Sequence, residues 1–156
     1  MDKISFTQKR PEQSLGFMFW QVTLQWQNTL RHALKPLGLT HIQFVLLVNL
    51  AWLQNQEKNV TQARLSQQSG VHIMMVSKVC RALERKALMI RQTAQDSRAK
   101  DLSLTKAGVT KAQAALKIVE TADAGYFAPL KEEGYALFLR ALSLLARAGK
   151  PEKSPV

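Results

Sequence analysis

Cysteine is nearly absent from this sequence, and the single thiol, Cys80, excludes an intramolecular disulfide framework and a multi-cysteine zinc site. Long apolar runs are absent too. The longest stretch, near residues 44–53, is broken by Asn49 and is too short to span a membrane, which takes roughly 20 residues. The first residues are mixed polar and lack the apolar run of a secretory signal. These absences favour a soluble, cytoplasmic protein without a membrane partner.

Acidic residues are scarce: 11 Asp and Glu stand against 22 Lys and Arg, so the formal net charge is +11. Such a balance favours an anionic partner, chiefly nucleic acid or a membrane surface. Between Thr61 and Lys111, ten basic residues stand against three acidic ones, so this segment carries +7 of the total. A generally basic, solvated surface would explain the charge alone equally well, so the positions of the charges must decide.

The motifs of enzyme chemistry are missing as well. The sequence contains no Gly-rich phosphate loop, no nucleophile elbow and no ligand cluster with metal-binding spacing. His32, His41 and His72 are not spaced as metal ligands, and the pair Glu132-Glu133 fits the macrodipole of a helix start. We therefore expect a protein that is not an enzyme and needs neither a cofactor nor a metal.

Apolar residues that recur every three or four positions predict a mainly α-helical chain. Lys35-Pro36-Leu37-Gly38 ends the first helix, since Pro removes a donor and Gly permits the turn. Thr40 and Gln43 form a capping box that opens the second helix. In chain order, we expect helices at residues 14–34, 40–54, 62–68, 72–86, 106–120 and 132–148.

Two strands are expected between the fourth and fifth helices, at residues 88–91 and 102–104, on either side of a polar turn at 95–100. Two short helices joined by the turn Ser69-Gly70 and followed by strand, turn and strand form a winged helix-turn-helix in outline. The expected fold class is thus mainly α, with a two-stranded β-wing. We assign residues 36–105 of this single chain, 1–156, to DNA binding, and residues 12–35 and 106–148 to helical dimerisation. Those terminal helices carry more apolar surface than the small DNA-binding part, residues 36–105, can cover.

The helix expected at 72–86 has one apolar face that should pack inward and one polar face that suits a major groove. Lys and Arg donate to guanine edges or phosphates, Ser bonds base or phosphate, and Met contacts thymine methyls. His72, just before the helix, is expected to contact a phosphate or to cap the helix. The candidate DNA contacts on the helix itself are Met74, Met75, Ser77, Lys78 and Arg81.

The polar turn supplies the second set of candidate contacts. Arg98, at the hairpin tip, is placed to enter a narrow minor groove, where the negative potential is strongest. Lys100 is placed to meet a phosphate and so to steepen the salt dependence of binding.

Several runs together resemble the MarR family of bacterial regulators. Leu39-Thr40-His41-Ile42-Gln43-Phe44 is similar to the start of the second helix in that family. Asp96-Ser97-Arg98-Ala99-Lys100, followed by Leu102-Ser103-Leu104-Thr105-Lys106-Ala107-Gly108, resembles its wing and the helix after it, and this is the most specific part. The resemblance implies a homodimer that reads a pseudo-palindromic operator in double-stranded DNA. It also implies that Arg98 enters the minor groove and that Asp96 helps to hold it.

The chain departs from the family pattern at three positions. Ala87 stands where Gly is common, Ser97 replaces a frequent Arg or Lys, and Arg64 stands where Glu is usual, adding charge close to the DNA side. Cys80 has a basic neighbour, which suits a redox sensor, but it falls on the inward face of its helix, which favours structural packing.

The residues predict sequence-specific binding of double-stranded DNA, and the family resemblance implies a transcriptional repressor that a small aromatic or anionic effector releases. Aromatic side chains on the first two helices, including Trp20, Trp26 and Phe44, line either an effector cavity or the core. Two alternatives remain open: a small-molecule sensor of the same fold without useful DNA affinity, and a protein that binds nucleic acid non-specifically. A membrane-surface role is disfavoured because the long helices lack a sharp division of basic and apolar faces.

Overall fold

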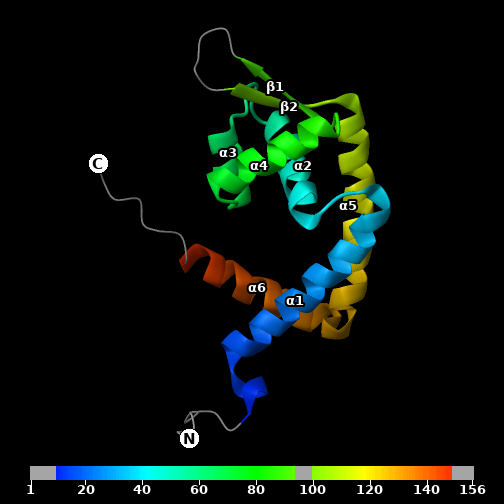
Figure 1. Cartoon of the computed structure of the whole chain (residues 1–156). Coiled ribbons are helices and arrows are strands. Elements are labelled where there is room, and N and C mark those ends of the chain that lie inside the picture. Colours follow the sequence, from blue (N-terminus) through cyan, green and yellow to red (C-terminus); the bar gives the residue numbers. More distant parts are fainter. Residues whose placement is uncertain (1–9, 94–99, 149–156) are drawn as a thin grey trace, which may run out of the picture. The chain divides into compact units, whose positions relative to one another are not determined.

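The computed structural model describes residues 10–93 and 100–148, which form two compact units, one through Ala122 and one from Asp123 (Figure 1). It confirms the expected fold class, mainly α with a two-stranded sheet. The elements in chain order are η1 (Pro11–Gln13), α1 (Leu15–Leu34), η2 (Lys35–Leu37), α2 (His41–Gln54), α3 (Gln62–Ser69), α4 (Ile73–Arg85), β1 (Met89–Thr93), β2 (Lys100–Leu104), α5 (Lys106–Phe127), η3 (Ala128–Leu130) and α6 (Lys131–Ala148).

Side-chain caps set where the helices of the first unit begin. The Thr40 hydroxyl accepts from the Gln43 amide and Gln43 Oε1 accepts from the Thr40 amide, so the expected capping box is confirmed. Thr61 caps α3 by accepting from the Arg64 amide, and the Thr105 hydroxyl accepts from the Gly108 amide at the start of α5. Each cap satisfies an amide that the first turn leaves without a helical partner.

The end of α5 differs from the expectation. The helix continues to Phe127, not to about Glu120. No proline occurs in the segment before Pro129, and a single glycine at Gly125 weakens a helix without ending it. The strands are also longer than expected, because β1 and β2 pair antiparallel as far as Thr93 and Lys100.

The core of the first unit gathers buried side chains from α1, α2, α3, α4, both strands and α5. In Figure 1, α3, α4 and the β1–β2 hairpin surround one end of α2. The carbonyl of Val60 accepts from the amide of Leu102 at 2.7 Å, and Thr61 forms an isolated β-bridge with Asp101, so the segment before α3 is held against β2. This pairing fixes the base of the wing to the helices, and α4 contacts both α3 and β1.

Large apolar side chains stay exposed on α1 and, separately, on α6. On α1 they begin with Leu15, which is 89% exposed, and α6 has no buried residue at all. In the second unit Phe127 contacts the rings of Tyr126, Tyr135 and Phe138. Within the described residues no single helix is both long and apolar enough to cross a membrane, although the stretch Leu15–Leu37 and α2, bent by 76°, meet the length and composition criteria together.

Candidate nucleic-acid interface

Helix α4 separates its apolar and polar side chains sharply. Val76, Val79, Cys80 and Leu83 are buried against the core, as the sequence predicted. The opposite face is exposed: Met74 is 71% and Met75 is 45% accessible, and Lys78 and Arg81 are also exposed. The burial of one face therefore holds the other toward solvent.

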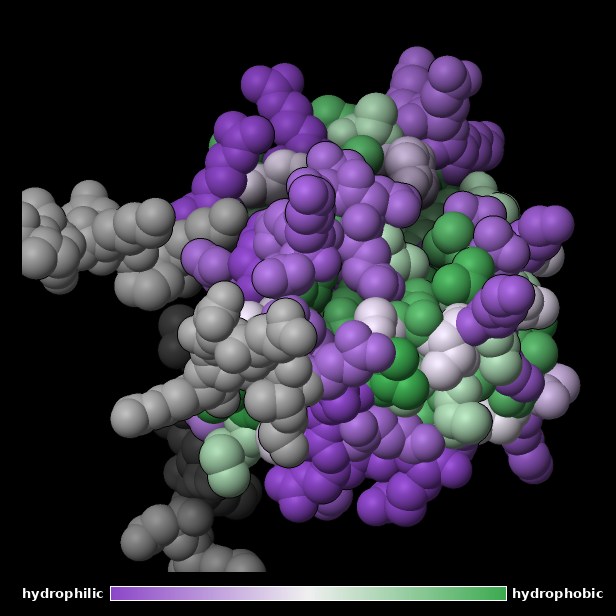
Figure 2. Space-filling view, turned by 90° about the horizontal axis from the view of Figure 1, so that it is seen from above, coloured by the Kyte–Doolittle hydropathy of each residue, from purple (hydrophilic) through white to green (hydrophobic). Residues whose placement is uncertain are grey.

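The exposed face of α4 forms a shallow hollow lined by Met74, Met75, Lys78, Arg81 and Arg85. The structure thus brings together four of the predicted site residues and adds Arg85, for which no DNA contact was predicted from the sequence. The spacing carried the signal, because residues 74, 78, 81 and 85 follow one another at helical steps of four, three and four. Two thioethers among three cations give this hollow both apolar and donor groups. Seen from above, hydrophilic side chains predominate over the wing end of the first unit, with apolar groups between them (Figure 2).

Two further predicted residues have defined local roles. Ser77 is partly buried, and its hydroxyl accepts from Nη2 of Arg81 at 3.2 Å, so it orients that guanidinium on the exposed face. His72 is the N-cap of α4, because Nδ1 accepts from the amide of Met74 at 3.3 Å. Of the two roles expected for His72, the structure confirms the capping role.

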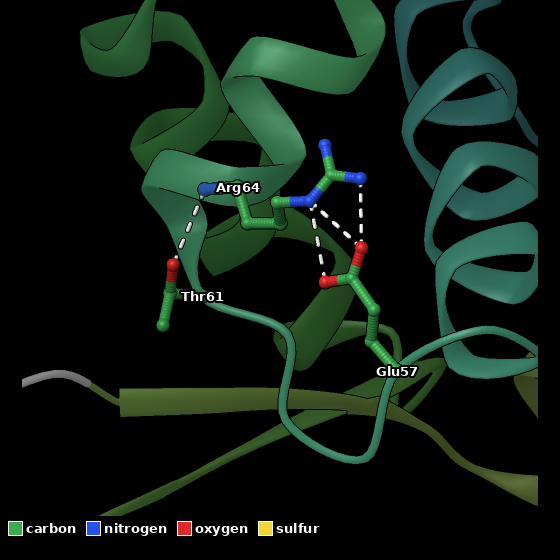
Figure 3. A network of polar contacts seen from close by, with 3 residues as sticks. All are labelled: Glu57, Thr61 and Arg64. Carbon is green, nitrogen blue, oxygen red and sulfur yellow. Dashed lines mark hydrogen bonds and ion pairs between the residues drawn. The ribbon is translucent and has the colours of Figure 1, made fainter.

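The basic residues around α4 are not equally free. Arg64, on α3, pairs with Glu57 in the preceding loop, with Nη2 2.7 Å from Oε1 and Nε 2.8 Å from the same oxygen (Figure 3). Glu57 therefore offsets the charge that Arg64 was expected to add on the DNA side. Arg91 on β1 pairs with Glu84 on α4, and the hydrogen bond to Glu84 raises the pKa of the Arg91 guanidinium. Arg64 and Arg91 therefore each form a salt bridge with a carboxylate of this chain.

Cys80 is a packing residue. Its side chain is fully buried, and burial, with a smaller contribution from Glu84, raises the pKa of the thiol to about 11 although the nearby Arg91 opposes the shift. A thiol with such a pKa is almost entirely protonated near neutral pH, and the thiolate is the reactive form. The structural interpretation of Cys80 is supported, and the redox interpretation is disfavoured.

The wing tip lies outside the described residues, and with it Asp96, Ser97 and Arg98. Lys100 is placed as the first residue of β2, paired with Thr93, and the structure describes its backbone alone. The strands β1 and β2 are described as far as Thr93 and Lys100, next to the tip.

The aromatic residues of α1 and α2 divide into two groups. Trp26 meets His41 edge-on at 5.2 Å between ring centroids, and His41 stacks on the buried Phe44 at 6.5 Å. Trp20, by contrast, is 57% exposed and contacts Phe17. Trp26 and Phe44 therefore pack with the core, whereas Trp20 does not. Among the described residues, no group of His, Cys, Asp or Glu is arranged to hold a metal ion.

Known proteins similar to this chain are regulators of transcription. YdcH, an uncharacterised HTH-type transcriptional regulator of Bacillus subtilis (strain 168), is 42% identical over 134 residues, which are 85% of this chain and 91% of YdcH. The MarR family protein Rv2887 of Mycobacterium tuberculosis, solved with p-aminosalicylic acid, is 30% identical with a TM-score of 0.66, covering 85% of this chain and 98% of Rv2887. No protein-family model matches the sequence.

The fold recurs in more distant structures. The transcriptional repressor CouR of Rhodococcus jostii RHA1, solved on a 23-mer DNA duplex, has a TM-score of 0.79 at 22% identity, covering 92% of this chain and 99% of CouR. Helix α4 buries one face and exposes the other, and a two-stranded hairpin follows it. Both features, and the similarity to these proteins, indicate a winged helix-turn-helix. The chain belongs to the MarR family of winged helix-turn-helix transcriptional regulators.

Proposed function

We propose that this protein is a homodimeric repressor that binds a pseudo-palindromic operator in double-stranded DNA and is released by a small-molecule effector. The observation that carries the proposal is the exposed face of α4. Its hollow combines Lys78, Arg81 and Arg85, which donate to guanine edges and phosphates, with Met74 and Met75, which suit thymine methyls. CouR, of the same fold, is named as a repressor and is bound to a DNA duplex.

The proposed contacts differ in what they read. Lys78 lies near the middle of α4 and Arg81, oriented by Ser77, lies about one turn further along, and both are proposed to contact bases, because Lys and Arg donate to guanine edges. Arg85, one turn further along, contacts a phosphate. Arg98 and Lys100 of the wing extend the footprint to the minor groove and the backbone, and Asp96 supports Arg98.

A second copy of this chain is the proposed partner of the exposed apolar helices. A soluble monomer rarely leaves large contiguous apolar patches in water. The large side chains left exposed on α1 are Leu15, Phe19, Trp20 and Leu24, and those on α6 are Tyr135, Leu137, Leu139, Leu144 and Leu145. The two DNA-binding parts of one dimer would read two half-sites about one helical turn apart. As a regulator of genes, the dimer would act in the cytoplasm.

A groove between α2, β2 and α5 is the candidate effector site. Its volume is about 420 Å³, within the range of small-ligand sites, although it is open to solvent, and its lining is mainly apolar. Its polar groups are the side-chain amides of Gln54, Asn55 and Gln113, without a cation. Relatives are solved with p-aminosalicylic acid and p-coumaroyl-CoA. We propose an aromatic effector for this groove, and the amides favour an uncharged one over an anion.

Competitive binding tests the proposal against its two alternatives. A labelled duplex carrying the preferred site is titrated at physiological salt, with and without excess unrelated duplex. A specific regulator should bind the duplex that carries its site ~10³-fold or more tightly than an unrelated duplex. Lys78→Ala or Arg81→Ala should change the base preference at one position, by about 1–3 kcal/mol for a base contact. Equal competition by unrelated duplex would indicate non-specific binding, and no binding at all would indicate a sensor without DNA affinity.

A further inference from the structure

Two lysines converge on the turn that joins α1 to α2. Nζ of Lys86, the residue after α4, lies 2.6 Å from the carbonyl oxygen of Gly38 and 2.9 Å from Oε1 of Gln43. Nζ of Lys111, on α5, lies 3.3 Å from the carbonyl oxygen of Leu37. The two ammonium groups thus bind consecutive carbonyls at the end of η2, although 48 and 74 residues separate them from those carbonyls in the chain.

The turn is a suitable site for cations. The last carbonyls of a helix lack helical donors and carry partial negative charge, so an ammonium group is favoured there. Gly38 holds the turn in the left-handed region at φ 65°, and the amide of Leu39 donates back to the carbonyl of Leu34. Gln43 is only 8% exposed and is fixed by the capping box. Lys86 therefore binds acceptors that are themselves held in place.

Lys86, the donor of these contacts, lies at the C-terminal end of α4. Lys86 is the C-cap of α4, and the following amides of Ala87 and Leu88 donate to the carbonyls of Glu84 and Leu83. Ala87 itself stands at φ 55°, a conformation that non-glycine residues rarely adopt. The last turn of α4 thus depends on a strained residue, and the Lys86 contact holds that turn against the α1–α2 turn.

We propose that Lys86 is a positioning residue for DNA binding, which fixes the C-terminal end of α4 and contributes to affinity without contacting DNA. Lys111 supports it by holding the neighbouring carbonyl. Four cations near α4 thus bind internal partners, namely Arg64, Lys86, Arg91 and Lys111, although Lys86 stays exposed to solvent. By contrast, Lys78, Arg81 and Arg85 line the exposed hollow of α4. The inference rests on the proposed binding of double-stranded DNA, but not on its sequence specificity.

The salt dependence of DNA affinity distinguishes a positioning lysine from one that binds phosphate. A lysine or arginine that neutralises a phosphate contributes about 0.9 to the slope of log affinity against log salt. We would measure affinity for one duplex at several salt concentrations, below the unfolding temperature of every variant. Lys86→Gln should weaken binding about threefold to tenfold at every salt concentration with the wild-type slope. Arg85→Gln should lower the slope by about 0.9, and Lys117→Gln, an exposed lysine of α5, serves as a control for lost charge.

Two further variants test whether Lys86 acts through its acceptor. Lys86→Arg, which keeps a cationic donor, should recover most of the affinity. Gln43→Met combined with Lys86→Gln should weaken binding by less than the product of the two single effects, because both changes remove the same Lys86–Gln43 contact. A slope that falls by about 0.9 for Lys86→Gln, an unchanged affinity, or strictly additive losses would each overturn the inference. If the wild-type protein binds no duplex, the proposed function fails instead.

Discussion

Ala87 is the residue at which a local cost in the backbone is clearest. Its φ of 55° places it at the left-handed position that ends α4, where glycine is favoured because it has no Cβ. Its carbonyl accepts from the Thr105 hydroxyl at 2.8 Å, so the backbone here also joins α4 to the start of α5. The turn has the usual hydrogen bonds of a helix end, but a less suitable residue occupies it.

Ala87→Gly should therefore stabilise the protein. We expect the free energy of unfolding to rise by about 0.5–1 kcal/mol, since relief of the strained φ outweighs the greater freedom of glycine in the unfolded chain. Urea denaturation measures the change. Gly70→Ala is the matched control, because Gly70 has φ 70° and nothing lies within 4 Å of the Cβ that alanine would add, and it should lose a similar amount. A less stable Ala87→Gly protein would contradict this account of the turn.

Cys80 should be unreactive in the folded protein. Burial raises the pKa of its thiol to about 11 from 9.0, so the fold favours the neutral form. This contribution to stability is complete below pH 9 and is lost as the pH rises toward 11. We expect the rate of thiol labelling of folded protein to stay low at pH 8 and to rise toward pH 11. Mild peroxide should leave DNA affinity unchanged. A loss of affinity that Cys80→Ser prevents would show instead that Cys80 is a sensor.

At the scale of elements, the start of α5 lies unusually close to the strand that follows α4. A Cβ at Gly108 would lie 1.9 Å from the carbonyl oxygen of Leu88, which is backbone and accepts from the amide of Thr105. The Leu88 carbonyl cannot move away from α5 without breaking its hydrogen bond to the Thr105 amide. A glycine is therefore required where α5 crosses the entry to β1.

Gly108→Ala should destabilise the protein strongly, by about 3 kcal/mol or more, because overpacking against fixed backbone costs more than helix propensity returns. Gly125→Ala, in the same helix but with nothing within 4 Å of the added carbon, should gain up to about 1 kcal/mol. Thermal unfolding of both variants checks the pair. Equal effects would show that the close approach at Gly108 does not limit the fold.

The sequence predicted most elements because their signals are local. Thr40 with Gln43, Thr61 and Thr105 mark helix starts within three residues of their partners, and the apolar face of α4 follows from helical spacing. The partners of Lys86 and Arg64 were not predictable in the same way. Lys86 reaches acceptors 43 and 48 residues away, and Arg64 turns back to a loop carboxylate, so both contacts depend on tertiary packing.

For the whole molecule, we propose that a second copy of the chain covers the exposed apolar side chains of α1 and of α6. Wild-type protein should sediment as a dimer at micromolar concentration. Leu137→Glu together with Leu144→Glu should shift the protein toward monomer, since Leu137 is 69% and Leu144 is 61% exposed and both would bury a charge in an interface. Gln67→Glu, at an exposed polar position of α3, should leave the dimer intact. A monomeric wild type would contradict the proposed assembly.

The exposed face of α4 is proposed to read a specific sequence in double-stranded DNA. Selection of bound duplexes from a random pool at physiological salt tests it most directly. We expect an enriched pseudo-palindrome whose half-sites lie about one helical turn apart, and Lys78→Ala or Arg81→Ala should alter the preferred base within each half-site. A pool without any enriched sequence would contradict specific recognition and leave charge-driven binding or a sensor without DNA affinity.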